Sequence, residues 1–176
     1  MKKILFLLAM LLMIVNVSFA MTGLIEMQTI NGVHVGMLPQ EVEQKWGQPL
    51  AKEYNGFFFK PGGLYGEFHT NGDTNVKYLR LIRAQNNPQL VLQPSGVSIG
   101  MSEQEVIRRL GEPDKKSYHG CVFENDIGHI YRLEYVSPPF VNAAGLSGKQ
   151  YVTVYIRENR NAVLKISLEG FFRKPQ

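Results

Sequence analysis

The sequence predicts an α+β fold of two tandem repeats, each a short helical layer packed on one face of an approximately four-stranded antiparallel sheet. Three observations predict it. A block of sequence occurs twice, 64 positions apart. Each copy carries the start and stop signals of a helix, and alternating apolar and polar residues follow each helix. A hydrophobic content of 44% with 11% aromatic residues excludes a disordered chain.

The repeat is visible without any gap in the alignment. When Gly32 to Phe59 is aligned with Gly96 to Phe123, 13 of the 28 positions are identical. The identities include these pairs: Gly36/Gly100, Met37/Met101, Glu41/Glu105, Gly47/Gly111 and Pro49/Pro113. Two copies at this period indicate two similar units rather than a solenoid. We therefore divide the chain into a first repeat, 21–92, and a second repeat, 93–176.

The first 20 residues have the three-part pattern of a secretory signal peptide. Lys2 and Lys3 precede an apolar run from Ile4 to Val15, and small residues stand three and one positions before a cut after Ala20. The apolar run is shorter than the roughly 20 residues that span a membrane. We therefore expect cleavage of residues 1–20, export to the periplasm or the cell exterior, and no permanent membrane anchor.

Each copy of the repeated block predicts one helix of about two turns. Ser102 and Glu105 have the spacing of a capping box, and Pro39 stands where a first-turn proline is tolerated. Gly47 and Gly111 predict the helix ends. Residues four apart predict one apolar face and one ion pair on each helix: Val42/Trp46, Val106/Leu110, Glu41/Lys45 and Glu105/Arg109.

Strand-like alternation follows each helix. The second repeat predicts strands near 117–124, 129–136, 150–157 and 162–168, and the first near 53–60, 64–69, 76–83 and, more weakly, 89–93. Val152, Val154 and Ile156 alternate with polar neighbours, which is typical of a half-buried strand. Short turns between consecutive strands predict antiparallel sheets with one face under a helix and the other open.

This pattern resembles two known groups. Gly36-Met37 through Pro49, and Gly100-Met101 through Pro113, match the motif of the SmpA/OmlA (BamE) domain, again after a signal peptide. The tandem helix-plus-sheet unit is similar to the β-lactamase inhibitor protein fold. The resemblance implies a protein-binding module. SmpA/BamE-like proteins are envelope lipoproteins that help barrel assembly, and the inhibitor-like group grips a partner with its open sheet and loops.

The chain departs from both groups at its cysteines. Met21 stands where a lipoprotein carries cysteine, and the single Cys121 cannot form a disulfide within the chain. In an oxidising compartment a lone thiol is best buried, so we expect Cys121 to lie in the core, with an intermolecular disulfide as the alternative.

No catalytic, cofactor or nucleic-acid motif stands out. His-Glu-x-x-His is absent, and the one Gly-x-Ser-x-Gly spacing, Gly96 to Gly100, lies in the repeated block, where the first copy has His34 in place of Ser98. We therefore expect no enzymatic activity and no cofactor. The glycine-rich stretch 62–66 lies between predicted strands and indicates a turn. Beyond the signal peptide the charges nearly balance, which disfavours nucleic-acid binding.

One group of residues leaves a metal site open as an alternative. The metal-binding candidates are His119, Cys121, Glu124 and His129. In the first repeat, Phe57 occupies the position that matches Cys121, which favours a core role for Cys121. We therefore predict no metal.

Two surfaces are candidates for binding a partner protein. The open sheet face should carry Tyr151, Thr153, Tyr155, Arg157 and Arg132, with Glu134 and Lys165 beside them. Tyrosine and arginine are enriched in protein interfaces, although solvated sheets also carry them. The second candidate is the loop 137–148, which is longer than its counterpart 70–75. Its apolar residues Phe140, Val141 and Leu146 either fold back or meet a partner.

The sequence thus predicts an exported, non-enzymatic module that binds another envelope or secreted protein. An envelope accessory role of the SmpA/BamE type is the preferred interpretation. The alternatives are a secreted inhibitor of a hydrolase and a module that binds a small ligand or a metal.

Overall fold

The computed structural model describes residues 25–53, 56–59, 63–123 and 126–175, without the side chains of 53 and 121–128. The predicted signal peptide and the side chain of Cys121 lie outside this description. Among the described residues, no helix is long and apolar enough to cross a membrane.

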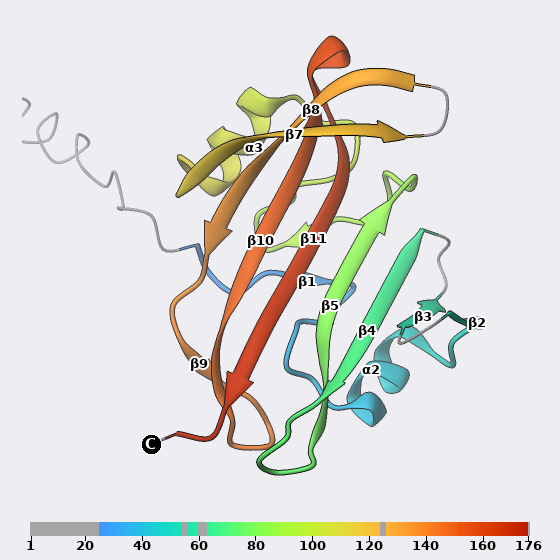
Figure 1. Ribbon diagram of the computed structural model, residues 1–176, viewed down its shortest axis with the longest axis vertical. Coiled ribbons are helices and arrows are strands. Elements are labelled where there is room, and N and C mark those ends of the chain that lie inside the picture. Colours follow the sequence, from blue (N-terminus) through green and yellow to red (C-terminus); the bar gives the residue numbers. More distant parts are fainter. Residues whose placement is uncertain (1–24, 54–55, 60–62, 124–125, 176) are drawn as a thin grey trace, which may run out of the picture.

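Figure 1 shows the order of the elements along the chain. The helices are α2 (Pro39–Trp46), α3 (Glu103–Leu110) and the short 3₁₀-helix η1 (Glu158–Arg160). The strands of the first half are β1 (Thr29–Ile30), β2 (Ala51–Glu53), β3 (Gly56–Phe59), β4 (Leu64–Thr70), β5 (Lys77–Gln85) and β6 (Leu92–Gln93). The second half adds β7 (Lys115–Phe123), β8 (Asp126–Val136), β9 (Phe140–Val141), β10 (Ser147–Arg157) and β11 (Ala162–Arg173).

The predicted fold class was wrong in its division into two separate helix-on-sheet repeats. In the described part of the chain, nine strands form one antiparallel sheet in the order β2-β3-β4-β5-β11-β10-β8-β7, with β9 beside β10. β5 pairs with β11 from Leu81↔Glu169 to Gln85↔Lys165, which joins the two halves. Separate sheets would have left two long strands with unpaired backbone edges, and this pairing removes both edges.

A row of buried residues crosses five strands of this sheet. Leu64, Ala84, Ile166, Val154 and Leu133 lie opposite one another in register, and each is 0% exposed. The row shows that one hydrophobic core continues across the junction of the two halves. The expectation that Val152, Val154 and Ile156 are buried is confirmed, since all three are 0% exposed.

Both helices pack against this buried face. Trp46 of α2 lies over Gly66, 3.6 Å from where a Cβ atom on this glycine would stand. Gly66 in turn pairs with the buried Ile82. On α3, Glu103 accepts a hydrogen bond of 2.6 Å from the Tyr131 hydroxyl, beside the buried row. In Figure 1, α3 and the β1 segment lie behind the strands of the sheet. The opposite face therefore remains open.

The two predicted helices are confirmed, and each forms half of a capping box. At α3, the Ser102 hydroxyl accepts a hydrogen bond from the Glu105 N–H at 3.3 Å, but the Glu105 carboxylate binds Arg108 and Arg109 instead of reaching back. At α2, the Glu41 carboxylate accepts a bond of 2.7 Å from the Leu38 N–H. Each helix start thus has one of the two reciprocal bonds.

The repeated Gly-Met pair attaches each helix to the sheet. The Gly36 N–H donates to the Leu79 carbonyl at 2.7 Å, and the Leu79 N–H donates to Met37 at 2.7 Å. Gly100 and Met101 make the same two bonds with Val163, at 2.8 and 2.7 Å. Gly36 and Gly100 have φ values of +93° and +92°, a region that favours glycine.

Several strand boundaries differ from the predicted ones. The predicted strand 53–60 is divided between β2 and β3, while 89–93 contains only β6, which pairs with β1 outside the main sheet. The loop 137–148 contains β9 and the start of β10. The pairing of β6 with β1 joins distant segments, and strands of only two to four residues leave little periodicity in the sequence.

Candidate functional site

The face of the sheet opposite the helices, here called the open face, is formed by rows of residues in register. One row contains Gln85, Lys165, Tyr155, Arg132 and Ser117. The next row along the strands contains Tyr65, Arg83, Ser167, Thr153, Glu134 and Lys115, and the row after it contains Leu81, Glu169, Tyr151 and Val136. The register therefore brings Tyr151, Thr153, Tyr155 and Arg132 together, with Glu134 and Lys165 beside them.

Contacts between side chains order the centre of the open face. The Lys165 ammonium lies 3.9 Å from the centroid of the Tyr155 ring, and the His119 ring meets the same tyrosine edge-on at 5.8 Å. Arg132 forms an ion pair of 3.2 Å with Glu134 and donates to the Ser117 hydroxyl at 3.1 Å. Because these contacts hold the side chains in place, less conformational entropy is lost when a partner binds.

Tyr151 is the most exposed tyrosine of the open face among the predicted residues. It is 42% exposed, whereas Thr153, Tyr155 and Arg157 are half-buried. Beyond Tyr151, Phe171 is 50% exposed and lies against the Arg80 guanidinium, 4.6 Å from its ring centroid. The open face thus presents aromatic surface close to positive charge, a composition typical of protein interfaces.

Positive charge exceeds negative charge on the open face. The described cations are Arg80, Arg83, Lys115, Arg132, Lys149, Arg157, Lys165 and Arg173, and the described carboxylates are Glu67, Glu134 and Glu169. Glu134 pairs with Arg132 and Glu169 with Arg80, at 3.2 and 3.1 Å. The surplus charge favours an acidic partner surface.

The loop 137–148 folds mainly onto the body of the protein. Leu146 is 2% exposed, and the Phe140 ring packs edge-on against Phe172 at 5.2 Å. The Asn142 amide donates to the Gly36 carbonyl at 3.0 Å, and its oxygen accepts from the Leu146 N–H at 2.9 Å. Among the three apolar residues predicted to meet a partner, Val141 is 62% exposed. The loop therefore offers Val141 to a partner, while Phe140 and Leu146 serve packing.

The residues weighed as metal ligands do not converge. His119 lies on the open face against Tyr155, whereas His129 contacts Tyr118 on the other face of the β7–β8 hairpin. Two imidazoles on opposite faces cannot hold the same ion. Cys121 and Glu124 have no described side chains, and the described residues contain no group of three or more potential metal ligands.

An ion pair links α3 to the edge of the sheet. Lys116 donates to Glu103 at 2.6 Å, and the Tyr131 hydroxyl bonds to the same carboxylate. Burial raises the pKa of Glu103, but the hydrogen bonds from Lys116 and Tyr131 outweigh burial and place this pKa below its ordinary value. Burial and the bond to Glu103 raise the pKa of Tyr131. These groups have a structural role in fixing the helix.

Arg157, the last predicted residue, lies at one end of the open face and lines a hollow of about 200 Å³ together with Arg160. Neither Lys149 nor Arg160 was predicted. Lys149 lies two residues before Tyr151 and so on the same face of the strand, but the predicted strand begins one residue after it. Arg160 lies between the predicted strands 150–157 and 162–168, and only the folded chain brings it to the hollow.

Comparisons with known proteins give no identification. No protein-family profile, no curated protein and no solved structure matches the chain.

Proposed function

We propose that this chain is an exported, non-enzymatic module that uses its open face to bind an acidic surface of another envelope or secreted protein. The observation that carries the proposal is the basic, aromatic centre of a broad sheet face opposite both helices. Tyr155 and Lys165 are register partners there, and Tyr151 lies on the same face of β10, two rows away. The resemblance to SmpA/BamE-like proteins supports an envelope accessory role.

The chemistry of the face specifies the partner. Tyr151 supplies exposed aromatic area, Lys149 supplies charge in the row next to Tyr151, and Lys165 supplies charge opposite Tyr155. Aromatic anchors contribute most of the affinity in many interfaces, whereas charges at the rim mainly steer association. We therefore expect binding that depends on the tyrosines at every salt concentration and on the lysines mostly at low salt.

The test is a quantitative capture from the exported fraction of the native host. The chain from Met21 onward is immobilised, crosslinked and washed, and the bound proteins are quantified by mass spectrometry. The compared variants are Tyr151→Ala with Tyr155→Ala, Lys149→Glu with Lys165→Glu, and the control Lys45→Glu on α2.

The expected result is one acidic protein whose affinity for both double variants falls about tenfold or more, while the control retains wild-type binding. Equal capture by all variants would show that the open face is not the contact surface. If every captured protein proved basic, the proposed charge complementarity would be wrong.

A further inference from the structure

The hollow at the end of the open face is built from segments that lie far apart in the sequence. Its lining comes from the ends of β5 and β10, the turn after β10, the first residues of β11 and the loop before α3. The lining residues are Asn86, Ile99, Gly100, Arg157, Arg160, Ala162, Val163 and Leu164. Both halves of the molecule therefore contribute to this one site.

Backbone geometry explains why these side chains meet. The register between β10 and β11 shifts after Tyr155↔Lys165, so that Ile156 pairs with Val163 and Leu164 is the extra residue of a bulge. Bulges redirect side chains and are frequent next to functional sites. The two hydrogen bonds between Val163 and the Gly100-Met101 segment bring the preceding Ile99 against this bulge.

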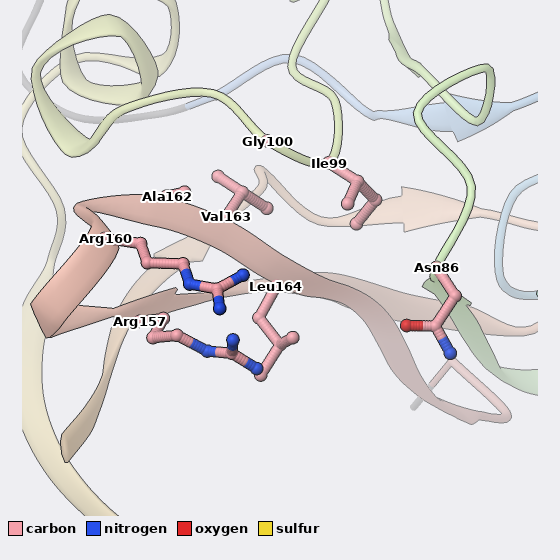
Figure 2. A pocket seen from close by; sticks show the side chains of 8 residues that line it. All are labelled: Asn86, Ile99, Gly100, Arg157, Arg160, Ala162, Val163 and Leu164. Atoms are coloured by element: carbon pink, nitrogen blue, oxygen red, sulfur yellow. The ribbon is translucent and has the colours of Figure 1, made fainter. Parts of the chain in front are cut away.

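The hollow combines two guanidinium groups with an aliphatic wall. Figure 2 shows Arg157 and Arg160 reaching into the same space, with Leu164 beside them and Asn86 on the far side. Arginine binds carboxylates with paired, directed hydrogen bonds. Ile99 and Val163 complete the apolar wall, and an amide such as that of Asn86 can both donate to and accept from a peptide group.

The size of the hollow limits what it can hold. Its volume of about 200 Å³ is below the roughly 300–1,000 Å³ of sites for drug-sized molecules and cofactors. A nucleotide is too large for it, whereas a single amino-acid residue is of suitable size. A free amino acid would bring an ammonium group towards two arginines, which disfavours it.

We propose that the hollow binds the C-terminal residue of a peptide chain when that residue is aliphatic. Arg157 and Arg160 bind the terminal carboxylate, Ile99, Val163 and Leu164 contact the aliphatic side chain, and Asn86 bonds to the last peptide group. Capture of a terminal carboxylate by converging donors is a recurrent mode of peptide recognition. The proposal does not depend on the surface around Tyr151.

The experiment uses small probes and the chain from Met21 onward with labelled methyl groups. N-acetyl-leucine contains the carboxylate, the aliphatic side chain and the last peptide group. N-acetyl-leucinamide differs by lacking the charge, and inorganic phosphate supplies charge without the side chain. Titrations followed by NMR report on the methyl groups of Ile99, Val163 and Leu164.

The expected result is saturable shifts of these methyl groups with N-acetyl-leucine, and affinity about tenfold or more weaker for the amide. The variants Arg157→Gln and Arg160→Gln should each lose about tenfold in affinity, while Arg173→Gln at the other end of β11 keeps wild-type affinity. Arg160 lies on an exposed turn, so its variant remains informative if Arg157→Gln does not fold.

Three outcomes would overturn the proposal. N-acetyl-leucinamide could bind as tightly as N-acetyl-leucine, or phosphate could match it, which would mean an adventitious anion only. The third is the absence of shifts in the folded wild-type protein. None of these results bears on capture by the open face, so this proposal and the proposed function can fail separately.

Discussion

Two asparagines each fasten a loop of one half of the molecule to the backbone of the other half. The Asn71 amide donates to the Phe172 carbonyl at 3.1 Å, and the Asn142 amide donates to Gly36 at 3.0 Å. Both side chains are 7% exposed, and both oxygens accept N–H groups of their own loop. In the sequence, both residues resemble ordinary turn formers, because their distant partners leave no local signal.

Replacing Asn142 by alanine is expected to lower the free energy of unfolding by on the order of 3 kcal/mol, because buried N–H and carbonyl groups lose their partners. Urea denaturation followed by circular dichroism measures this change. The control Asn159→Ala, in the exposed turn after β10, should stay within about 0.5 kcal/mol of wild type. Similar losses for both variants would contradict the role assigned to Asn142.

The Glu105 carboxylate predicts a pH dependence at acid pH. Hydrogen bonds from Arg108 and then Arg109, at 2.7 and 2.6 Å, lower the pKa of Glu105 from 4.5 to about 2. A carboxyl group with a lowered pKa stabilises the folded state above its ordinary pKa, and this contribution is lost as the pH falls through the folded value. The contribution of the Glu105 carboxylate to the free energy of unfolding should therefore be fully present above about pH 5 and should disappear towards pH 2.

Melting temperatures of wild type and Glu105→Gln, measured between pH 7 and pH 2, test this expectation. The difference between the two proteins should be small, since the ion pairs lie at the surface, and should shrink below pH 5. Gln104→Ala on the same helix serves as the control without a charge change. A difference that remains constant down to pH 2 would contradict the assignment.

At the scale of elements, the helices were predictable and several strand pairings were not. Each helix has its start, its apolar face and its end within about a dozen residues, so local rules define it. The open-face residues Tyr151, Thr153 and Tyr155 were predictable for a similar reason, since alternation assigns them to one side of β10. By contrast, the loop 137–148 folds back through contacts with Gly36 and Phe172, which lie far away in the sequence.

The cap of α3 gives a prediction at this scale. Ser102→Ala removes the acceptor for the Glu105 N–H and should cost about 1 kcal/mol. Thermal unfolding measures the loss, and Ser102→Asp, which restores an acceptor at the same position, should recover most of it. If the aspartate variant were as unstable as the alanine variant, the hydroxyl would not act as a cap.

At the scale of the whole molecule, the pairing of β5 with β11 decides the architecture. The repeat in the sequence indicated two similar halves, but an internal repeat does not specify whether their sheets remain apart or join. The two sheets join through backbone hydrogen bonds between two strand edges. These bonds require no particular side chains, so the sequence contains no pattern that predicts them. For this reason the individual strands were largely predictable and the continuous sheet was not.

A continuous core across this pairing predicts one cooperative unfolding transition. Trp46 is the single tryptophan and lies in the first half, so its fluorescence reports that half, whereas far-UV circular dichroism reports the whole sheet. The two denaturation curves should coincide, and the fragment 93–176 alone should not fold. Separate transitions would indicate halves that unfold independently.

The position of β7 has a consequence for the behaviour of concentrated solutions. β7 is the last strand of the sheet and pairs with β8 alone among the described strands. An open strand edge invites a second copy to add to it and start an aggregate. Lys115 is exposed on one face of this strand, and Lys116, although paired with Glu103, is exposed on the other, so approaching copies repel each other. High salt shortens the range of that repulsion to about 3 Å at 1 M. Stocks of the protein should therefore stay clear at low ionic strength and become turbid as salt is added.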